Sequence, residues 1–220
     1  MMGTGVAGIL FGSKAADLLE RVVAPIAARD GSGFLSLFPV GRFRIYTVTG
    51  RLHSRPEAEY RLMVNGAVGT PVAFTMDDLR AMPATRMTKD FQCVTGWRVR
   101  DVKWTGVRLA DLLDKAGVQD GAWGVRLLSF DGVYTETLTM DQARRDDVIV
   151  AYEMLGKPVT AAHGGPARLY VAPMYGYKSI KWLETIEVSQ TEARQGYWEV
   201  RGYDTDAWIG KSNNRDDRPV

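Results

Sequence analysis

The chain has 220 residues, of which 45% are hydrophobic and 25% are charged. This composition is ordinary for a globular protein, and the length favours one large domain over two small ones. The 28 Lys and Arg residues nearly balance the 26 Asp and Glu residues, giving a net charge of +2. A general nucleic-acid binder needs a much larger basic excess, so we expect no nucleic-acid partner. With one cysteine, no internal disulfide can form, which leaves the redox compartment open.

The N-terminal stretch differs in character from the remainder, and we expect an N-terminal segment over 1–37 before a domain over 38–220. No stretch approaches the roughly 20 consecutive apolar residues that span a bilayer. The first 12 residues are small, apolar and uncharged, like the middle of an export signal without its basic start. One interpretation is a frayed leader or short helix in a cytoplasmic protein. The second is a leader whose twin-Arg start lies upstream, which would make the protein exported, periplasmic or membrane-associated.

Periodicity and turn signals predict the elements of the first half of the chain. Thr75 is placed to cap a helix, and a strand leads directly to Cys93. The predicted elements are a helix over Ala15–Ala28 ended by Asp30–Gly33, strands over Phe43–Val48 and Tyr60–Val64 with a turn at Asn65-Gly66, a helix over Met76–Met82, and a strand over Thr85–Val94.

The second half predicts more strands and two further short helices. Gly117 is suited to end a helix, and Thr139 with Gln142 has the spacing of a capping box. The predicted elements are a helix over Leu109–Ala116, a hairpin of Val125–Phe130 and Tyr134–Leu138, and strands over Val148–Tyr152, Arg168–Val171 and Leu183–Val188. Together these elements predict a mixed α+β fold that is rich in strands.

Most familiar catalytic motifs are absent. His53 and His163 are the only histidines, and neither stands in a paired spacing that would indicate a zinc site. The sequence contains no Walker loop, no G-x-G-x-x-G after a strand and no G-x-S-x-G elbow, which are the usual signs of nucleotide cofactors and serine hydrolases.

Two segments remain as candidates for chemistry. Cys93 is followed by Val94-Thr95-Gly96-Trp97-Arg98; it is either a small buried hydrophobe or a thiolate that acts as nucleophile or soft metal ligand. Arg98 and Arg100 could lower its pKa if they point inward. The second segment runs from His163 through Arg168 to Lys181 and mixes Arg, Lys and Ser with aromatic residues. It is either a solvated basic surface or an anion site suited to phosphate.

Taken together, the two segments resemble the molybdopterin-binding domain of the sulfite oxidase superfamily. The resemblance rests on Cys93-Val94-Thr95-Gly96-Trp97 with Val102–Val107, and on Gly164–Leu169 with Tyr175–Lys181, and covers about 40–190. Within the superfamily the chain is most similar to the bacterial branch that contains the catalytic subunit of periplasmic methionine-sulfoxide reductase. Sulfite oxidases usually carry Cys-Ala-Gly-Asn-Arg at the cysteine and append an immunoglobulin-like dimerisation domain. The roughly 30 residues after Ser189 are too few for that domain, which favours a monomer.

The resemblance implies a set of cofactor-binding residues. Cys93 corresponds to the molybdenum ligand. Arg168, Ser179, Ile180 and Lys181, with Lys178 beside them, correspond to the positions that hold the phosphate end of the pterin. His163 stands where the branch has Asn, and Ser129 where it has Thr. The positions of an Asn and a Tyr–Glu pair are taken by Arg42, Arg44 and Ile45. Trp97, Arg98 and Tyr134 are predicted to line the pocket.

The implied activity is oxygen-atom transfer by one mononuclear molybdenum-molybdopterin. We expect reduction of a small S- or N-oxide such as methionine sulfoxide. Because the sequence has no haem or iron–sulfur motif, the electrons would come from a partner, in this branch a haem-bearing membrane subunit. Oxidation of sulfite is the second possibility within the family. Outside the family, Cys93 and His163 could serve a cysteine hydrolase or transferase, or the chain could be a binding module without catalysis.

Overall fold

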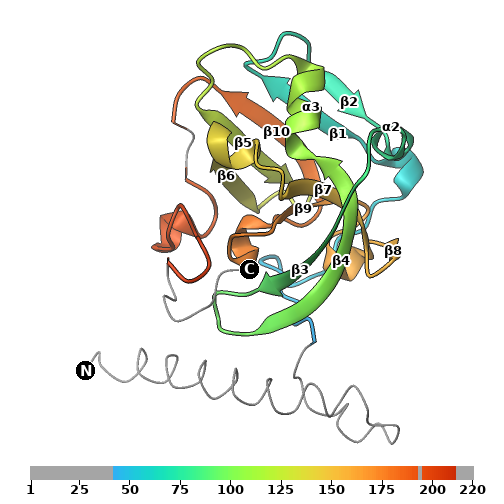
Figure 1. Cartoon of the computed structure of the whole chain (residues 1–220), viewed down its shortest axis with the longest axis vertical. Helices are drawn as coiled ribbons and strands as arrows, with labels where there is room; N and C mark the ends of the chain where they lie inside the picture. Colours follow the sequence, from blue (N-terminus) through green and yellow to red (C-terminus); the bar gives the residue numbers. More distant parts are fainter. Residues whose placement is uncertain (1–41, 193–194, 212–220) are drawn as a thin grey trace, which may run out of the picture.

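The computed structural model describes residues 42–192 and 195–211. These residues form two five-stranded sheets joined by short helices and turns (Figure 1). The α+β fold expected from the sequence is confirmed. The predicted helix over Ala15–Ala28 and the possible leader lie outside the described residues. No helix in the described part of the chain is both long and apolar enough to cross a membrane.

The first sheet has the strand order β2-β1-β10-β5-β6. β1 and β10 run parallel, and the other neighbours are antiparallel. The β5–β6 hairpin was predicted from its Asp131-Gly132 turn and is confirmed. The strands are β1 (Leu62–Gly66), β2 (Val72–Phe74), β5 (Gly124–Ser129), β6 (Thr135–Thr139) and β10 (Leu183–Ser189).

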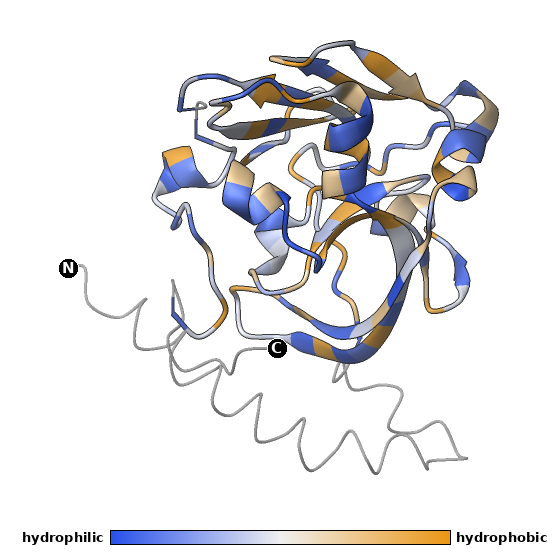
Figure 2. Ribbon diagram, turned by 45° about the horizontal axis from the view of Figure 1, so that its top comes forward, coloured by the Kyte–Doolittle hydropathy of each residue, from blue (hydrophilic) through white to orange (hydrophobic). Residues whose placement is uncertain are grey.

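The second sheet has the order β3-β4-β7-β8, and β9 also pairs with β7. Its β3–β4 hairpin is long and extends away from the first sheet (Figure 1). Along this hairpin hydrophobic and hydrophilic residues alternate (Figure 2). The strands are β3 (Thr85–Gln92), β4 (Arg98–Arg108), β7 (Val148–Met154), β8 (Lys157–Pro158) and β9 (Arg168–Val171).

Capping residues fix the ends of the short helices. Thr75 and Thr139 each form a capping box with the residue three positions later, as their spacing predicts. Gly117 ends α3 in the left-handed conformation at φ 68°. The α-helices are α2 (Met76–Ala81), α3 (Leu109–Ala116) and α4 (Met140–Ala143), and the 3-10 turns are η2 (Glu57–Glu59), η3 (Ala161–His163), η4 (Gly176–Lys178) and η5 (Glu199–Arg201).

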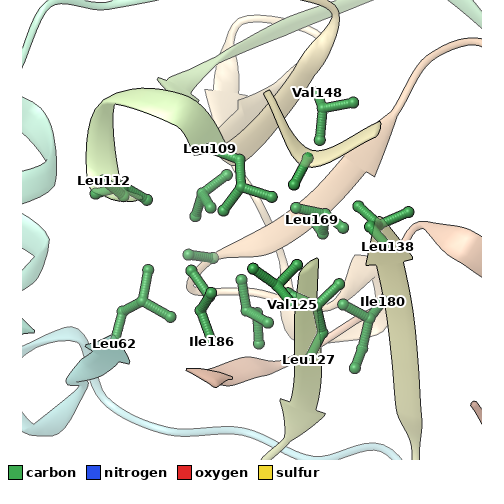
Figure 3. Packing of buried hydrophobic residues seen from close by; sticks show 14 of the residues in the cluster. Leu62, Leu109, Leu112, Val125, Leu127, Leu138, Val148, Leu169, Ile180 and Ile186 are labelled. Atoms are coloured by element: carbon green, nitrogen blue, oxygen red, sulfur yellow. The ribbon is translucent and has the colours of Figure 1, made fainter. Parts of the chain in front are cut away.

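Two hydrophobic cores hold these layers together. The larger core lies where α3 covers the first sheet and meets β7 and β9; Leu109 and Leu112 of α3 are fully buried there with Ile186 of β10 (Figure 3). The smaller core is aromatic and lies on the second sheet, where Trp104 stacks on Tyr170 with ring centroids 4.2 Å apart. Cys93 packs against this smaller core, so the second sheet fixes the position of the one cysteine.

Several predictions for individual elements need correction. Asn65 and Gly66, predicted as a turn, are the last residues of β1 and pair with β10, and the short strands β2 and β8 were not predicted. Phe43–Val48, predicted as a strand, has no regular secondary structure; all six of its residues line the cavity described below. The strand β4 was not predicted. Its polar residues alternate with buried Val102 and Trp104, and its length is explained by pairing with both β3 and β7.

Candidate active site

A cavity of about 420 Å³ opens where the Cys93 turn, the segment 43–48 and the C-terminal segment meet. It collects Phe91 and Arg168 from strands of the second sheet, Asp131 and Tyr134 from the β5–β6 turn, and residues of several irregular segments. Its lining consists of Phe43, Arg44, Ile45, Tyr46, Thr47, Val48, Phe91, Cys93, Val94, Thr95, Trp97, Asp131, Tyr134, His163, Arg168, Gly176, Tyr177, Ser179, Lys181, Trp182, Tyr197, Trp198 and Tyr203.

Cys93 is presented to the cavity by a tight turn between β3 and β4. The amide of Gly96 donates to the carbonyl of Cys93 at 3.0 Å, and the amide of Cys93 donates to the carbonyl of Trp97 at 2.9 Å. Gly96 adopts φ 94°, a conformation that glycine tolerates best. The Thr95 hydroxyl donates to Cys93 Sγ at 3.2 Å, an interaction that favours the thiolate over the thiol.

Three basic side chains, His163, Arg168 and Lys181, form what we call the cationic wall of the cavity. The Arg168 guanidinium donates to the carbonyls of Leu169, His163 and Ser179 at 2.7–3.2 Å. Lys181 Nζ donates to the carbonyls of Tyr46 and Ala162 at 3.0 and 2.9 Å. Within 42–192 and 195–211, neither cation has a carboxylate at ion-pair distance. The wall therefore carries positive charge that backbone carbonyls orient but do not neutralise.

The electrostatics of the cationic wall reflect this lack of counter-charge. Burial, with the nearby Arg168 charge, lowers the pKa of Lys181 to about 8. Burial likewise lowers the pKa of Arg168 to about 10. Burial and the charges of Arg168 and Lys181 lower the pKa of His163 below its ordinary value. An anion bound at this wall would relieve all three effects, because it would stabilise the charged forms.

Ser179 and the segment 43–48 complete this side of the cavity. The Ser179 hydroxyl accepts from the amide of Val171 at 3.0 Å, which fixes the end of β9. Phe43 packs edge-on against His163 with ring centroids 4.9 Å apart. Arg44 and Ile45 line the cavity as predicted residues of the site, whereas Arg42 is exposed and is not part of the lining.

Other predicted site residues lie away from the lining. Ser129 is buried and its hydroxyl accepts from the Asp131 amide at 3.1 Å. Ile180 is buried in the larger core. Arg98 pairs with Asp90 at 3.6 Å and donates to Gln92. Lys178 Nζ is fully buried between two glutamates. Direct cofactor contacts by Arg42, Ser129, Lys178 and Ile180 thus stay predictions that this placement does not support.

The cavity also has an aromatic wall, which is formed by uncharged rings where the cationic wall has basic groups. Most of its residues were not predicted from the sequence. We use this name for Tyr134, Tyr177, Tyr197, Trp198 and Tyr203, of which only Tyr134 was predicted to line the pocket. Tyr134 stacks on Tyr197, and successive ring contacts of 5.0–5.4 Å lead through Trp198 and Tyr203 to Tyr177. The available signal was the density of aromatic residues in a glycine-rich stretch without a predicted element.

The cavity fits a ligand with an anionic end and a hydrogen-bonding ring system. Trp97 lines it, and the buried Nε1–H of Trp97 has no hydrogen-bond partner in the described part of the chain. Asp131 is the one carboxylate among the described residues of the lining, and its Oδ1 already accepts from the amides of Val133 and Tyr134. No group of three His, Cys, Asp or Glu residues within the described ranges could hold a metal. A metal at Cys93 would therefore need further ligands from a cofactor.

Comparison with known proteins supplies the family. Residues 49–198 match the family model described as the oxidoreductase molybdopterin binding domain. The chain belongs to this family. A molybdopterin accounts for the cavity, because it carries an anionic phosphate, hydrogen-bonding ring nitrogens, and sulfur donors that can share a metal with one cysteine.

Several relatives are similar over most of the domain. An uncharacterized oxidoreductase of Bacillus subtilis, YuiH, is 37% identical over 66% of this chain and 72% of its own length. A provisionally named protein-methionine-sulfoxide reductase subunit of Azospira oryzae is 29% identical over 77% of this chain and 63% of its own. Sulfite oxidase of Arabidopsis thaliana is 29% identical over 66% of this chain and 45% of its own.

A solved structure shows the same fold. The sulfane dehydrogenase SoxCD from Paracoccus pantotrophus matches with a TM-score of 0.59 at 24% identity, over 67% of this chain and 41% of that one. The protein is thus a molybdopterin oxidoreductase of the sulfite oxidase superfamily, as the Cys93 and Arg168–Lys181 segments predicted. The chain spans less than half the length of this structure and of the plant sulfite oxidase.

Proposed function

We propose that the protein holds one mononuclear molybdenum on Cys93 and reduces a small S- or N-oxide such as methionine sulfoxide. The bound cofactor would supply two-electron oxygen-atom transfer. The observation that carries the proposal is the placement of Cys93 Sγ in the same cavity as a cationic wall that lacks a carboxylate partner in the described ranges. That pairing provides one soft metal ligand and one anion site, which a molybdenum-bearing pterin phosphate needs.

The residues of the chain divide the work. Arg168 and Lys181 would bind the phosphate, because backbone carbonyls already orient the guanidinium and ammonium groups. His163 and the buried Nε1–H of Trp97 would hydrogen-bond the pterin. Cys93 would ligate the metal, with the Thr95 hydroxyl holding the sulfur in place. The aromatic wall would exclude water from the reacting centre.

The aromatic wall favours an oxide with apolar substituents over a small dianion. Its five side chains offer ring faces and hydroxyls. A cation beside it, Arg201, stacks on the Tyr197 ring at 3.7 Å and also donates to the Tyr197 carbonyl. A neutral S-oxide would gain contact area against these rings. Sulfite is an anion and would need a cation that is not already engaged, whereas Arg201 is engaged with Tyr197. Sulfite oxidation is the second candidate, because a sulfite oxidase is among the relatives.

Metal analysis tests the cofactor, and activity tests the substrate. The full chain and Cys93→Ser would be expressed in a host that makes molybdopterin. We expect about one molybdenum per wild-type chain. A reduced dye should be oxidised with methionine sulfoxide as acceptor, faster than an oxidised dye is reduced with sulfite. Absence of molybdenum from well-folded protein would overturn the proposal, and faster turnover of sulfite would select the second candidate.

The proposal extends to the electron donor and its location. Because a reductase of this kind must be supplied with two electrons per turnover, we propose a haem-bearing membrane protein as donor to a monomeric subunit. With such a donor, we propose that the protein works outside the cytoplasm and is exported through a twin-Arg leader. Fractionation of the native organism, with detection of this chain, tests the location: recovery in the cytoplasm would contradict it.

A further inference from the structure

Behind the aromatic wall lies a fully buried cluster of two glutamates and one lysine. Lys178 Nζ donates to Glu136 Oε1 at 2.5 Å and to Glu199 Oε1 at 2.7 Å, and all three side chains have 0% exposure. Glu136 Oε1 also accepts from the Thr137 amide at 2.9 Å. The second carboxyl oxygen of each glutamate, Oε2, is buried and has no hydrogen-bond partner within the described ranges.

The charges of this cluster do not balance when both carboxyl groups are ionised. One ammonium compensates one carboxylate, and a second carboxylate without exposure or a full set of donors would be strongly destabilising. Two buried acids side by side avoid this state by sharing one proton. The other titratable groups that face them are Tyr134 and Tyr177, each of which interacts with both carboxyl groups. Burial, and secondarily the Glu199 carboxyl, raises the pKa of Glu136 well above its ordinary value despite Lys178.

The cluster joins the aromatic segment to the body of the fold. Glu136 lies on β6 and Lys178 ends η4, whereas Glu199 belongs to the segment that carries Tyr197, Trp198 and Tyr203. A Cβ built on Gly196 would lie 2.5 Å from Glu199 Oε2 and 2.8 Å from Glu136 Oε1, so the segment presses its backbone directly against both carboxyl groups. The ion pair between Lys178 and Glu199 is fully buried and anchors this segment to the body of the fold.

We propose that Glu136, Lys178 and Glu199 form a proton-dependent clasp that holds the aromatic wall over the cavity. With one shared proton the cluster is neutral and the wall is closed. Loss of that proton to solvent leaves a buried net negative charge, which is relieved when Glu199 and its segment move away. Glu136 and Glu199 are thus positioning residues: they act on the substrate through Tyr197, Trp198 and Tyr203.

The direction of the pH dependence follows from the charge. A carboxyl group whose pKa is raised on folding stabilises the closed form at low pH, and that stabilisation is lost as pH rises through the raised pKa. The wall is therefore closed at mildly acidic pH and opens with increasing pH. The consequence for substrate affinity rests on the proposed function, whereas closure itself does not.

Hydrogen exchange of the full-length protein, read by mass spectrometry over the backbone amides of 195–205 and corrected for intrinsic rates, measures closure without any turnover. From mildly acidic to mildly alkaline pH we expect wild-type exchange in this segment to accelerate roughly tenfold, the equivalent of one pKa unit. Glu136→Gln, which mimics the protonated acid, should keep the segment protected across the range. Lys178→Met leaves two buried acids without a counter-charge and should accelerate exchange of the segment above the wild-type rate, most strongly at alkaline pH. Glu187→Gln, a half-exposed partner of Arg126, should behave as wild type.

Peptides of α3 and β7 report whether each variant is folded, so loss of the whole structure is distinguishable from opening of the segment. A wild-type pH profile in Glu136→Gln would overturn the clasp. So would a Lys178→Met variant whose segment is protected as well as that of wild type. In the loaded enzyme we expect KM for methionine sulfoxide to rise with pH in wild type and to stay level in Glu136→Gln, with kcat little changed. A clasp seen by exchange in protein that reduces no oxide would refute the proposed function alone.

Discussion

The cationic and aromatic walls of the cavity solve the problem of buried charge in opposite ways. Arg168 and Lys181 are supported by backbone carbonyls, so their charge remains available to a ligand. The ionisable groups behind the aromatic wall, Glu136, Lys178 and Glu199, neutralise one another. The comparison shows why two lysines only three positions apart have different roles: one faces the ligand cavity, and the other pairs with protein carboxyl groups.

The two walls also differ in how they are built. The cationic wall comes from the end of η3, the start of β9 and the connection between η4 and β10, and β9 is fully buried. The aromatic wall comes largely from the segment after β10, which contains one 3-10 turn in its described part and depends on side-chain contacts. The cationic wall is therefore already in place when a ligand binds, whereas the aromatic wall can change its conformation with pH.

The largest expected effect belongs to Cys93, which is part of neither wall. Cys93→Ala should reduce turnover to background, because no other described residue offers a soft ligand at the cavity. It should change the free energy of unfolding by less than about 1 kcal/mol, since the side chain is only half-buried. Steady-state rates and urea unfolding measure both. Turnover equal to wild type would remove Cys93 from the ligand role.

Arg168→Met should have the next largest effect, on stability and on cofactor content together. Three carbonyls lose a charged donor inside the fold, which we expect to cost about 3 kcal/mol. Arg55→Met is the matched control, because Arg55 forms a half-exposed pair with Glu184 and should cost less than about 1 kcal/mol. Equal losses in urea unfolding would show that the burial of Arg168 has no energetic importance.

The two walls should respond to pH with opposite sign. Lys181 has its pKa lowered to about 8 from 10.5, so the folded protein binds fewer protons than the unfolded chain between these values. The stability of cofactor-free protein should therefore gain a contribution as pH rises from about 8 to 10.5. The aromatic segment should loosen as pH rises. Urea unfolding at several pH values tests the first effect, and Lys181→Met should abolish it; a slope that persists would assign it to another group.

The smallest effect should come from a single hydroxyl of the aromatic wall. Tyr177 donates to the Asp204 carbonyl at 2.7 Å, and Tyr177→Phe should lose about 1 kcal/mol. If the wall contacts substrate, KM for methionine sulfoxide should rise roughly fivefold, which is the same free energy. Tyr152→Phe changes a tyrosine of the larger core on β7 and should leave KM unaltered. The same KM change in both variants would assign the effect to general packing.

The sequence predicted well those elements that depend on local interactions. The capping boxes at Thr75 and Thr139, the Gly117 helix end and the β5–β6 hairpin are each encoded within a few residues. The strand β4 could not be predicted in this way, because its many polar residues give no strand signal. The strand is stabilised by pairing with β3 on one edge and β7 on the other. Phe43–Val48 was the converse error: its residues favour a strand, but the segment has no regular secondary structure and all six residues line the cavity.

The sequence by itself determined the family and three elements of its chemistry: the single cysteine at a strand end, the basic segment ending in Lys181, and the cofactor that both imply. Motifs suffice there because these residues lie in short turns whose conformation is set by nearby residues, as at Cys93 and Gly96. Only the tertiary structure decided that Lys178 belongs to a buried cluster with Glu136 and Glu199. Those two residues stand 42 and 21 positions from Lys178. A local sequence pattern therefore cannot show whether the Lys178 ammonium binds a ligand or pairs with a carboxylate of the protein.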